Sequence, residues 1–153
     1  MAAKKNKKSS TAKKTIVSLQ IIDLHADGFH PLIDVLVFGK HFTLVLDTGA
    51  SKTAFDQTIL LKANENAIVT LSDSFSTGLG TNSMVSSTAK ITDLYIGDLL
   101  IDEFEVAVLD LSSINNAYKQ LGQPEVLGVL GGDILMKYKA VINYGKRVIK
   151  LKK

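Results

Sequence analysis

The spacing of apolar residues constrains the fold most strongly, because they alternate with other residues at a period of two along most of the chain. This period is typical of strands with one buried face, and helical spacing is confined to short stretches. Of the 153 residues, 46% are apolar and 22% are charged, which is ordinary for a globular protein. The length fits one domain. We therefore predict a mainly β protein whose single domain spans residues 15–153.

Turn residues divide this pattern into elements. The predicted strands cover residues 15–22, 32–38, 41–46, 52–55, 67–72, 84–96, 99–111 and 125–130, with a closing hairpin over 140–151. A turn-rich connection is expected over residues 25–31. Three segments are predicted to be short helices: 57–63 with Asp56 as N-cap, 112–122 with Ser112 or Ser113 as N-cap, and 131–138.

Charge is unevenly distributed at the N-terminus. Six of the eighteen basic residues lie in the first fourteen positions, where there is no acid: Lys4, Lys5, Lys7, Lys8, Lys13 and Lys14. We predict that residues 1–14 form a disordered basic tail. It could contact nucleic acid or an acidic surface, but a solubilising tail is the favoured interpretation. The rest of the chain is mildly acidic, so nucleic acid is not a predicted partner.

Several classes of protein are disfavoured by what the sequence lacks. There is no run of about 18 apolar residues and no apolar stretch directly after the basic start, so we predict neither membrane insertion nor secretion, and expect a cytoplasmic protein. Zero cysteines leave no disulfide framework and no thiolate nucleophile. A metal site at His25, Asp27, His30 and His41 is conceivable, but their spacing is not that of a ligand set. We predict no metal and no cofactor.

The most specific motif is FTLVLDTGAS, residues 42–51, in which an apolar strand ends at Asp47. A buried, isolated carboxylate is costly, so Asp47 must be solvated, hydrogen-bonded or share a proton. Gly49 allows a tight turn that brings its N–H toward the carboxylate, and the Thr48 hydroxyl can join a local hydrogen-bond network. The motif therefore predicts a rigid loop that presents one carboxylate.

Two interpretations of this loop remain open from its local sequence. Ala50 and Ser51 keep the loop small, as expected at the floor of a groove, but an aspartate can equally cap its own turn. A second segment favours the groove: about 80 residues downstream, an apolar strand over 126–130 is followed by Gly131, Gly132 and a predicted helix. The two segments have the same design, in which an apolar strand leads into a loop of small residues.

Four segments together resemble the retropepsin-like aspartic proteases, including their bacterial members. They are LVLDTGAS (44–51), STGLGT (76–81), TDLYIGDLLIDEFEVAVLDL (92–111) and VLGGDILMKYKAVINY (129–144). The resemblance covers roughly residues 15–151. It implies a retropepsin-like lobe: a closed, barrel-like sheet with one or two short helices and a flap hairpin.

The resemblance also implies roles for single residues. Asp47 would be the catalytic carboxylate, Thr48 would reach across a two-fold axis, and Gly49 would shape the floor of the site with Ala50 and Ser51. Leu130 and Gly131 would lie beneath this loop. The substrate-binding flap would consist of Thr77, Gly78, Leu79, Gly80 and Thr81.

The chain has only one copy of this element. Asp133 is not followed by Thr or Ser and Gly, and the segment 73–75 lacks the glycine, so a pair of carboxylates requires a homodimer. Two close carboxylates share one proton, which lets one of them activate water while the other polarises a peptide carbonyl. Together with this single copy, the resemblance implies an aspartic endopeptidase acting on a polypeptide substrate. The alternative is an inactive homodimeric module of the same fold that binds peptides or supports assembly.

Overall fold

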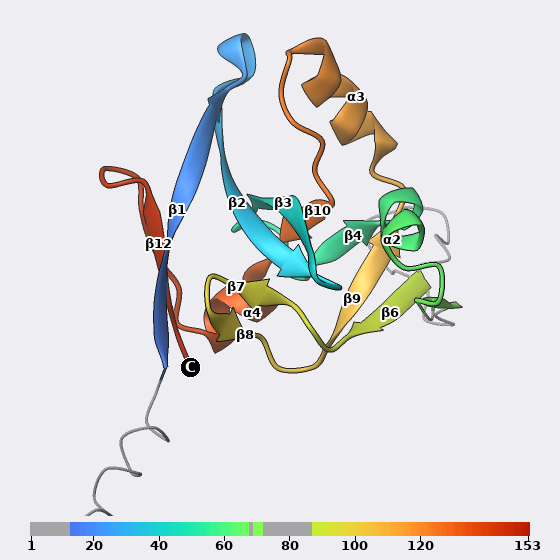
Figure 1. Ribbon diagram of the computed structural model, residues 1–153. Helices are drawn as coiled ribbons and strands as arrows, with labels where there is room; N and C mark the ends of the chain where they lie inside the picture. Colours follow the sequence, from blue (N-terminus) through green and yellow to red (C-terminus); the bar gives the residue numbers. More distant parts are fainter. Residues whose placement is uncertain (1–12, 68, 72–86) are drawn as a thin grey trace, which may run out of the picture.

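The computed structural model describes residues 13–67, 69–71 and 87–153. Its strands are β1 (Lys14–Asp23), β2 (Phe29–Val37), β3 (Lys40–Leu46), β4 (Ala54–Asp56), β5 (Val69–Leu71), β6 (Ser87–Ile91), β7 (Tyr95–Ile96), β8 (Leu99–Leu100), β9 (Phe104–Leu109), β10 (Gly128–Leu130), β11 (Val141–Asn143) and β12 (Val148–Lys152). Its helices are η1 (His25–Asp27), a 3-10 turn, and α2 (Gln57–Ala63), α3 (Ser112–Gln120) and α4 (Gly132–Lys137). The predicted mainly β class is confirmed (Figure 1).

The strands form one sheet in the order β11-β12-β1-β2-β3-β10-β4-β9-β6-β5, and the β7–β8 hairpin pairs with β2 beside it. The predicted closure into a barrel is wrong, because in the described part of the chain β11 pairs only with β12, and β5 only with β6. Closure requires the first and last strands to pair. Two of the strands are short and are followed by helices. The three-residue strand β4 is directly followed by α2, and the three-residue strand β10 is followed by α4.

Several predicted boundaries also need correction. Residues 92–94 divide the predicted strand 84–96 into β6 and β7, and the predicted strand 99–111 is divided into β8 and β9. Phe29, His30 and Pro31, which were expected in a connection, belong to β2. Lys14, which was assigned to the tail, is the first residue of β1. The described chain has the three α-helices that the residue pattern predicts, whereas the resemblance implied one or two.

The N-cap of α3 was also predicted wrongly. It is Leu111, whose side chain cannot cap, rather than Ser112 or Ser113. The carboxylate of Asp110 accepts a hydrogen bond of 3.0 Å from the Ser112 N–H and so satisfies one free donor of the first turn. Asp110, which lies outside the helix, thus accepts a hydrogen bond from the first turn, as a serine N-cap was expected to do.

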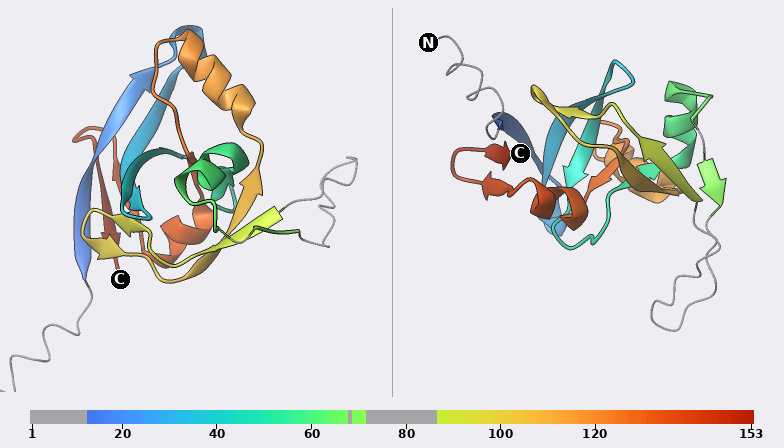
Figure 2. Two further views of the ribbon diagram at one scale, coloured as in Figure 1. Left: turned by 45° about the vertical axis from the view of Figure 1, so that its right-hand side comes forward. Right: turned by 90° about the horizontal axis from the view of Figure 1, so that it is seen from below.

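The buried side of the sheet explains the strand pattern. In β1, Thr15 and Leu19 are buried while Lys14, Ile16 and Ser18 are exposed, as the period of two requires. The main core lies between the buried face of the sheet and the helices. It contains large buried side chains such as Phe55, Leu60 and Tyr138. Figure 2 shows β1 and β12 on one side of the molecule and α2 and β6 on the opposite side. None of the described helices is long and apolar enough to cross a bilayer.

Asp56 is the N-cap of α2, as predicted. Its side chain accepts hydrogen bonds from the N–H of Ile59 at 3.0 Å and from the N–H of Leu111 at 2.8 Å, although the residue is only 4% exposed. We expect Asp56→Ala to lower the free energy of unfolding by about 2 kcal/mol, because two backbone donors lose their acceptor. Urea unfolding measures this. The control Asp110→Ala removes an exposed acceptor and should cost under about 1 kcal/mol, and equal losses would contradict the prediction.

Candidate active site

Strand β3 delivers Asp47 to the edge of the core. Leu44, Val45 and Leu46 are buried, and β3 runs parallel to β10 with Leu46 opposite Leu130. Directly after this pair, the N–H of Asp47 donates a hydrogen bond of 3.0 Å to the carbonyl oxygen of Leu130. The backbone of Asp47 is thereby fixed to the buried ends of β3 and β10, and this fixes the position of its side chain.

The loop after β3 has the local geometry that its residues predict. The N–H of Gly49 donates to Asp47 Oδ1 at 3.1 Å, and the N–H of Ala50 donates to the Asp47 carbonyl at 3.1 Å. The first contact is also what an aspartate capping its own turn makes. It fixes the carboxylate orientation with respect to the loop, which both interpretations require.

Asp47 is exposed in the single chain, and so are Thr48, Gly49 and Ser51, while Ala50 is half-buried. Of the three options for Asp47, solvation therefore applies to one chain alone, because the strand ends at the surface and water reaches the residue that follows it. No Lys, Arg or His of the described residues forms an ion pair with Asp47. The loop presents an unpaired carboxylate to its surroundings.

The segment that joins β10 to α4 lies directly under this loop. The N–H of Gly132 donates to the carbonyl of Ala50 at 2.7 Å, and the N–H of Asp133 donates to the carbonyl of Ser51 at 3.1 Å. A Cβ at Gly131 would lie 2.6 Å from the carbonyl carbon and oxygen of Lys52, closer than real atoms approach. Leu130 and Gly131 thus lie beneath the loop, and only glycine permits this approach of two backbones.

A second link, between Thr53 and Asp133, was missed from the sequence. Thr53 is fully buried, and its hydroxyl donates to Asp133 Oδ1 at 2.8 Å while accepting from the N–H of Gly131 at 3.0 Å. The Thr53 N–H also donates to the same carboxylate, at 3.0 Å and 3.1 Å to its two oxygens. The available signal was an acid in the first turn of a helix that follows two glycines. Asp133 therefore has a structural partner and fixes the C-terminal end of the loop.

A hollow of about 400 Å³ opens beside Asp47. Its walls come from the β1–β2 turn, the ends of β3 and β10, and α3. Most of the lining side chains are apolar, among them Leu24, Val45, Ile114, Leu121 and Val129. The polar ones include Asp27, His30 and Tyr118. A cavity of this size and lining suits an apolar side chain of a ligand, held next to the Asp47 carboxylate.

His30 and Tyr118 form the polar wall of this hollow. The imidazole Nδ1 and the phenol oxygen share a hydrogen bond of 2.7 Å, and Tyr118 is only 3% exposed. Burial raises the pKa of the Tyr118 phenol, and the negative charge of Asp47 raises it further. The phenol therefore stays protonated near the carboxylate.

This electrostatic contact gives a testable result. Asp47→Asn should lower the pKa of Tyr118, because removing a nearby negative charge makes the tyrosinate anion less unfavourable. NMR titration of ring-labelled tyrosine, assigned with Tyr118→Phe, measures the pKa. Asp34→Asn is the control, since Asp34 faces His41 rather than this hollow. A Tyr118 titration that is identical in the parent protein and in Asp47→Asn would show that the two groups are not close.

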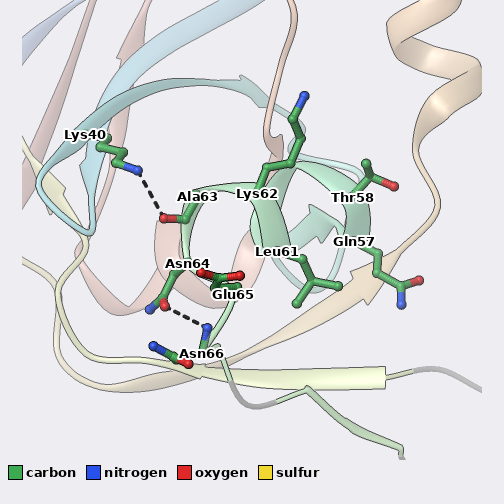
Figure 3. A pocket seen from close by; sticks show the side chains of 9 residues that line it. All are labelled: Lys40, Gln57, Thr58, Leu61, Lys62, Ala63, Asn64, Glu65 and Asn66. Carbon is green, nitrogen blue, oxygen red and sulfur yellow. Dashed lines mark hydrogen bonds between the residues drawn. The ribbon is translucent and has the colours of Figure 1, made fainter.

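A larger hollow of about 970 Å³ lies at α2 and is a different kind of site (Figure 3). Lys40 reaches across it and donates a hydrogen bond of 3.2 Å to the carbonyl of Ala63, and the N–H of Asn66 donates to Asn64 Oδ1 at 3.0 Å. Asp47 does not line it. Lys40 and Asn64 bond to the protein itself, and Glu65 is the only acid among the described residues that line this hollow, so we assign it no chemistry.

Two other sets of residues were singled out in the sequence, the flap and the conceivable metal ligands. The flap residues 77–81 lie outside the described residues. The histidines of the conceivable metal site are not brought together, because His41 bonds to Asp34 at 2.9 Å while His30 bonds to Tyr118. Among the residues that the structure describes, no three potential ligands are grouped for a metal ion.

Comparison with known proteins identifies the class. The family model described as "Aspartyl protease" matches residues 33–134, which is about two thirds of the chain and includes the Asp47 loop and Gly131. The chain belongs to this family, whose members are hydrolases of peptide bonds, and the resemblance seen in the sequence is confirmed. A comparison with curated protein sequences found no match.

Solved structures agree on the fold. A retropepsin-like aspartic protease from Rickettsia conorii has a TM-score of 0.52 at 15% identity, with 93% of this chain and 92% of that chain covered. EIAV protease in complex with the inhibitor HBY-793 has a TM-score of 0.53 at 18% identity, covering 74% of this chain and 92% of that chain. The retroviral protease-like domain of Ddi1 from Leishmania major gives 0.50 at 12% identity, covering 78% and 86%. The lobe is retropepsin-like.

Proposed function

We propose that this protein is an aspartic endopeptidase that works as a homodimer, in which the Asp47 carboxylates of two chains activate one water molecule. The single observation that most supports it is the exposed, unpaired carboxylate of Asp47 on a loop held by β10 and α4. A surface carboxylate needs no such rigid support for solubility alone. A catalytic group does, because its position must be fixed before the substrate arrives.

Two chains are needed because the mechanism uses two carboxylates at one site. Asp133 is engaged by Thr53, and Asp27 lines the hollow from the β1–β2 turn without a supporting loop like that of Asp47. Within the described residues, one chain therefore offers one suitable acid. A two-fold axis beside the loop would bring the second one and would let Thr48, which is exposed, contact the opposite loop.

The proposed chemistry uses the shared proton. Two carboxylates about 3 Å apart do not both ionise, so the pair holds one proton and one negative charge. The ionised oxygen takes a proton from water, which attacks the peptide carbonyl, while the protonated carboxyl donates a hydrogen bond to the carbonyl oxygen. The resulting tetrahedral intermediate is not bonded to the enzyme. No metal or cofactor is needed for this step.

The substrate that fits is an extended, unfolded polypeptide. The apolar hollow of about 400 Å³ beside Asp47 can take one large apolar side chain, and backbone hydrogen bonds to an extended chain would supply the rest of the affinity. The inhibitor complex of EIAV protease shows that a ligand binds to a protein of this fold. We place the activity in one domain, residues 15–153, and expect it in the cytoplasm.

The test combines cleavage with a mass measurement. Purified protein should cleave an apolar peptide library in mildly acidic solution, and the cleavage rate per chain should fall on dilution as the dimer dissociates. Analytical ultracentrifugation at the same concentrations gives the dimer fraction. A stable dimer that binds the peptides without cleaving them would establish the inactive peptide-binding module instead. Cleavage by a species that remains monomeric would contradict the paired-carboxylate mechanism.

A further inference from the structure

The charges of this chain are segregated along the sequence. All fifteen acidic residues lie between Asp23 and Asp133, whereas thirteen of the eighteen basic residues lie outside that range. The last twenty residues contain seven basic residues and no acid. Both ends are therefore strongly cationic, although the formal charge of the whole chain is only +3.

The fold brings the described start of the chain, from Lys13, next to the C-terminal strands. Strand β1 pairs antiparallel with β12, and β12 pairs antiparallel with β11. The register sets Lys14 opposite Lys152. It also sets Ile16 opposite Lys150, which in turn lies opposite Val141. Figures 1 and 2 show β12 beside β1 at one side of the molecule, across from α2 and β6.

One face of this three-stranded part of the sheet is in the core and the other faces solvent. Thr15, Ile149 and Leu151 are buried on the inner face. The outer face, which we call the cationic face, consists of Lys14, Ile16, Ser18, Val141, Asn143, Val148, Lys150 and Lys152. It has no acidic residue.

The lysines of the cationic face form no ion pair among the described residues, and Asp98 lines a hollow together with Lys14 and Ile16. The ion pairs of this region are those of Lys137 and Lys153 with Asp102, which lie outside the cationic face. Lys14, Lys150 and Lys152 have no ion pair within the part of the chain that the structure describes. Like charges directly opposite each other, as in Lys14 and Lys152, destabilise a sheet, so a partner of negative charge would relieve them.

Two aliphatic side chains stand among these lysines. Ile16 is 64% exposed and Val141 is 54% exposed, and both are in the same cross-strand row as Lys150. Surfaces that bind nucleic acid rely mainly on arginine and aromatic residues, and the cationic face has neither. A bilayer interface rewards both features, because lysines attract anionic headgroups while apolar side chains enter the acyl boundary.

We infer that the cationic face is a docking surface for a membrane rich in anionic lipid. Lys14 and Lys152 form one cross-strand row of this face, and Ile16, Lys150 and Val141 form the next, so lysines and exposed aliphatic side chains lie together where a bilayer surface could contact them. A second copy of this chain is not the occupant, since two such faces repel each other. The inference stands on different residues from the proposed catalysis and does not depend on it.

The test is co-sedimentation of the full chain with lipid vesicles. We expect binding to phosphatidylcholine vesicles that contain phosphatidylserine, loss of binding to pure phosphatidylcholine, and weakening as salt rises. Lys150→Glu with Lys152→Glu should reduce binding by about 30-fold or more, given the contribution of each lysine near such a surface. The matched control is Lys62→Glu with Lys119→Glu, which changes net charge equally at exposed positions outside the cationic face and should bind like the parent.

Ile16→Ser separates the cationic face from the basic tail. It leaves every charge in place, so binding through the tail alone would be unchanged, whereas docking of the face predicts a loss of about 5-fold or more. Thermal unfolding of each variant checks that the sheet is intact. The inference fails if Ile16→Ser binds like the parent, or if both lysine pairs have equal effects. It also fails if an RNA or DNA oligonucleotide binds to the face more tightly than vesicles at the same salt concentration.

Discussion

Replacing Asp47 by Asn is expected to reduce peptide cleavage by about 10³-fold or more, because an amide cannot accept the proton of the attacking water. The substitution changes little else. An asparagine has the same shape, and its side-chain oxygen can still accept the hydrogen bond that the Gly49 N–H donates at 3.1 Å. The loop, the dimer and the thermal stability should therefore be those of the parent. Initial rates with an apolar peptide, together with the mass in solution, measure both parts.

Mixing the variant with the parent protein tests the role of the second chain. If two Asp47 carboxylates are required, equal amounts of parent and Asp47→Asn leave about a quarter of the dimers active after subunits exchange. Activity per parent chain then falls to about half. A single-chain enzyme would keep its full activity per parent chain in the mixture. Full activity, with subunit exchange shown by mass spectrometry, would exclude the paired mechanism while leaving Asp47 as a catalytic residue.

Local sequence predicted the features that depend on neighbouring residues. The end of an apolar strand at Asp47, the contact between Gly49 and that carboxylate, and the capping of α2 by Asp56 each involve residues within three positions of one another. Side-chain chemistry at such short range is fixed by the backbone turn itself. The family could also be recognised, because the motifs over 44–51 and 129–144 are both local, each joining an apolar strand to a loop of small residues.

The features that the sequence did not reveal depend on residues distant along the chain. Thr53 and Asp133 are 80 positions apart, and His30 and Tyr118 are 88 apart, so neither pair shows a local pattern. The open sheet has a similar origin. Whether β11 pairs with β5 depends on where α2 and α4 interrupt the run of strands. The sequence of a single strand does not show this. The exposure of Asp47 likewise depends on which chains surround it.

The second large effect is expected from Gly131→Ala, which should lower the free energy of unfolding by about 2 kcal/mol and reduce cleavage by about 10²-fold. The cause is steric. Gly131 has φ of −105°, which alanine also adopts, but the added Cβ would lie 2.6 Å from the carbonyl group of Lys52 and 2.9 Å from the oxygen of Ala50. These are backbone atoms, so the loop after Asp47 must move as a unit. Urea unfolding and initial cleavage rates measure the two losses.

Gly132→Ala is the matched control for this substitution. The next glycine also lies under the loop, but a Cβ there would be 3.5 Å from the oxygen of Ala50 and 3.7 Å from that of Ser51, which are ordinary contacts. Alanine also favours the first turn of α4, so stability should stay within about 0.5 kcal/mol of the parent and cleavage should be retained. If both variants lose activity equally, small size at either position matters and the contact with Lys52 is not the cause. If neither loses activity, the support of the loop by β10 and α4 does not position Asp47 for catalysis.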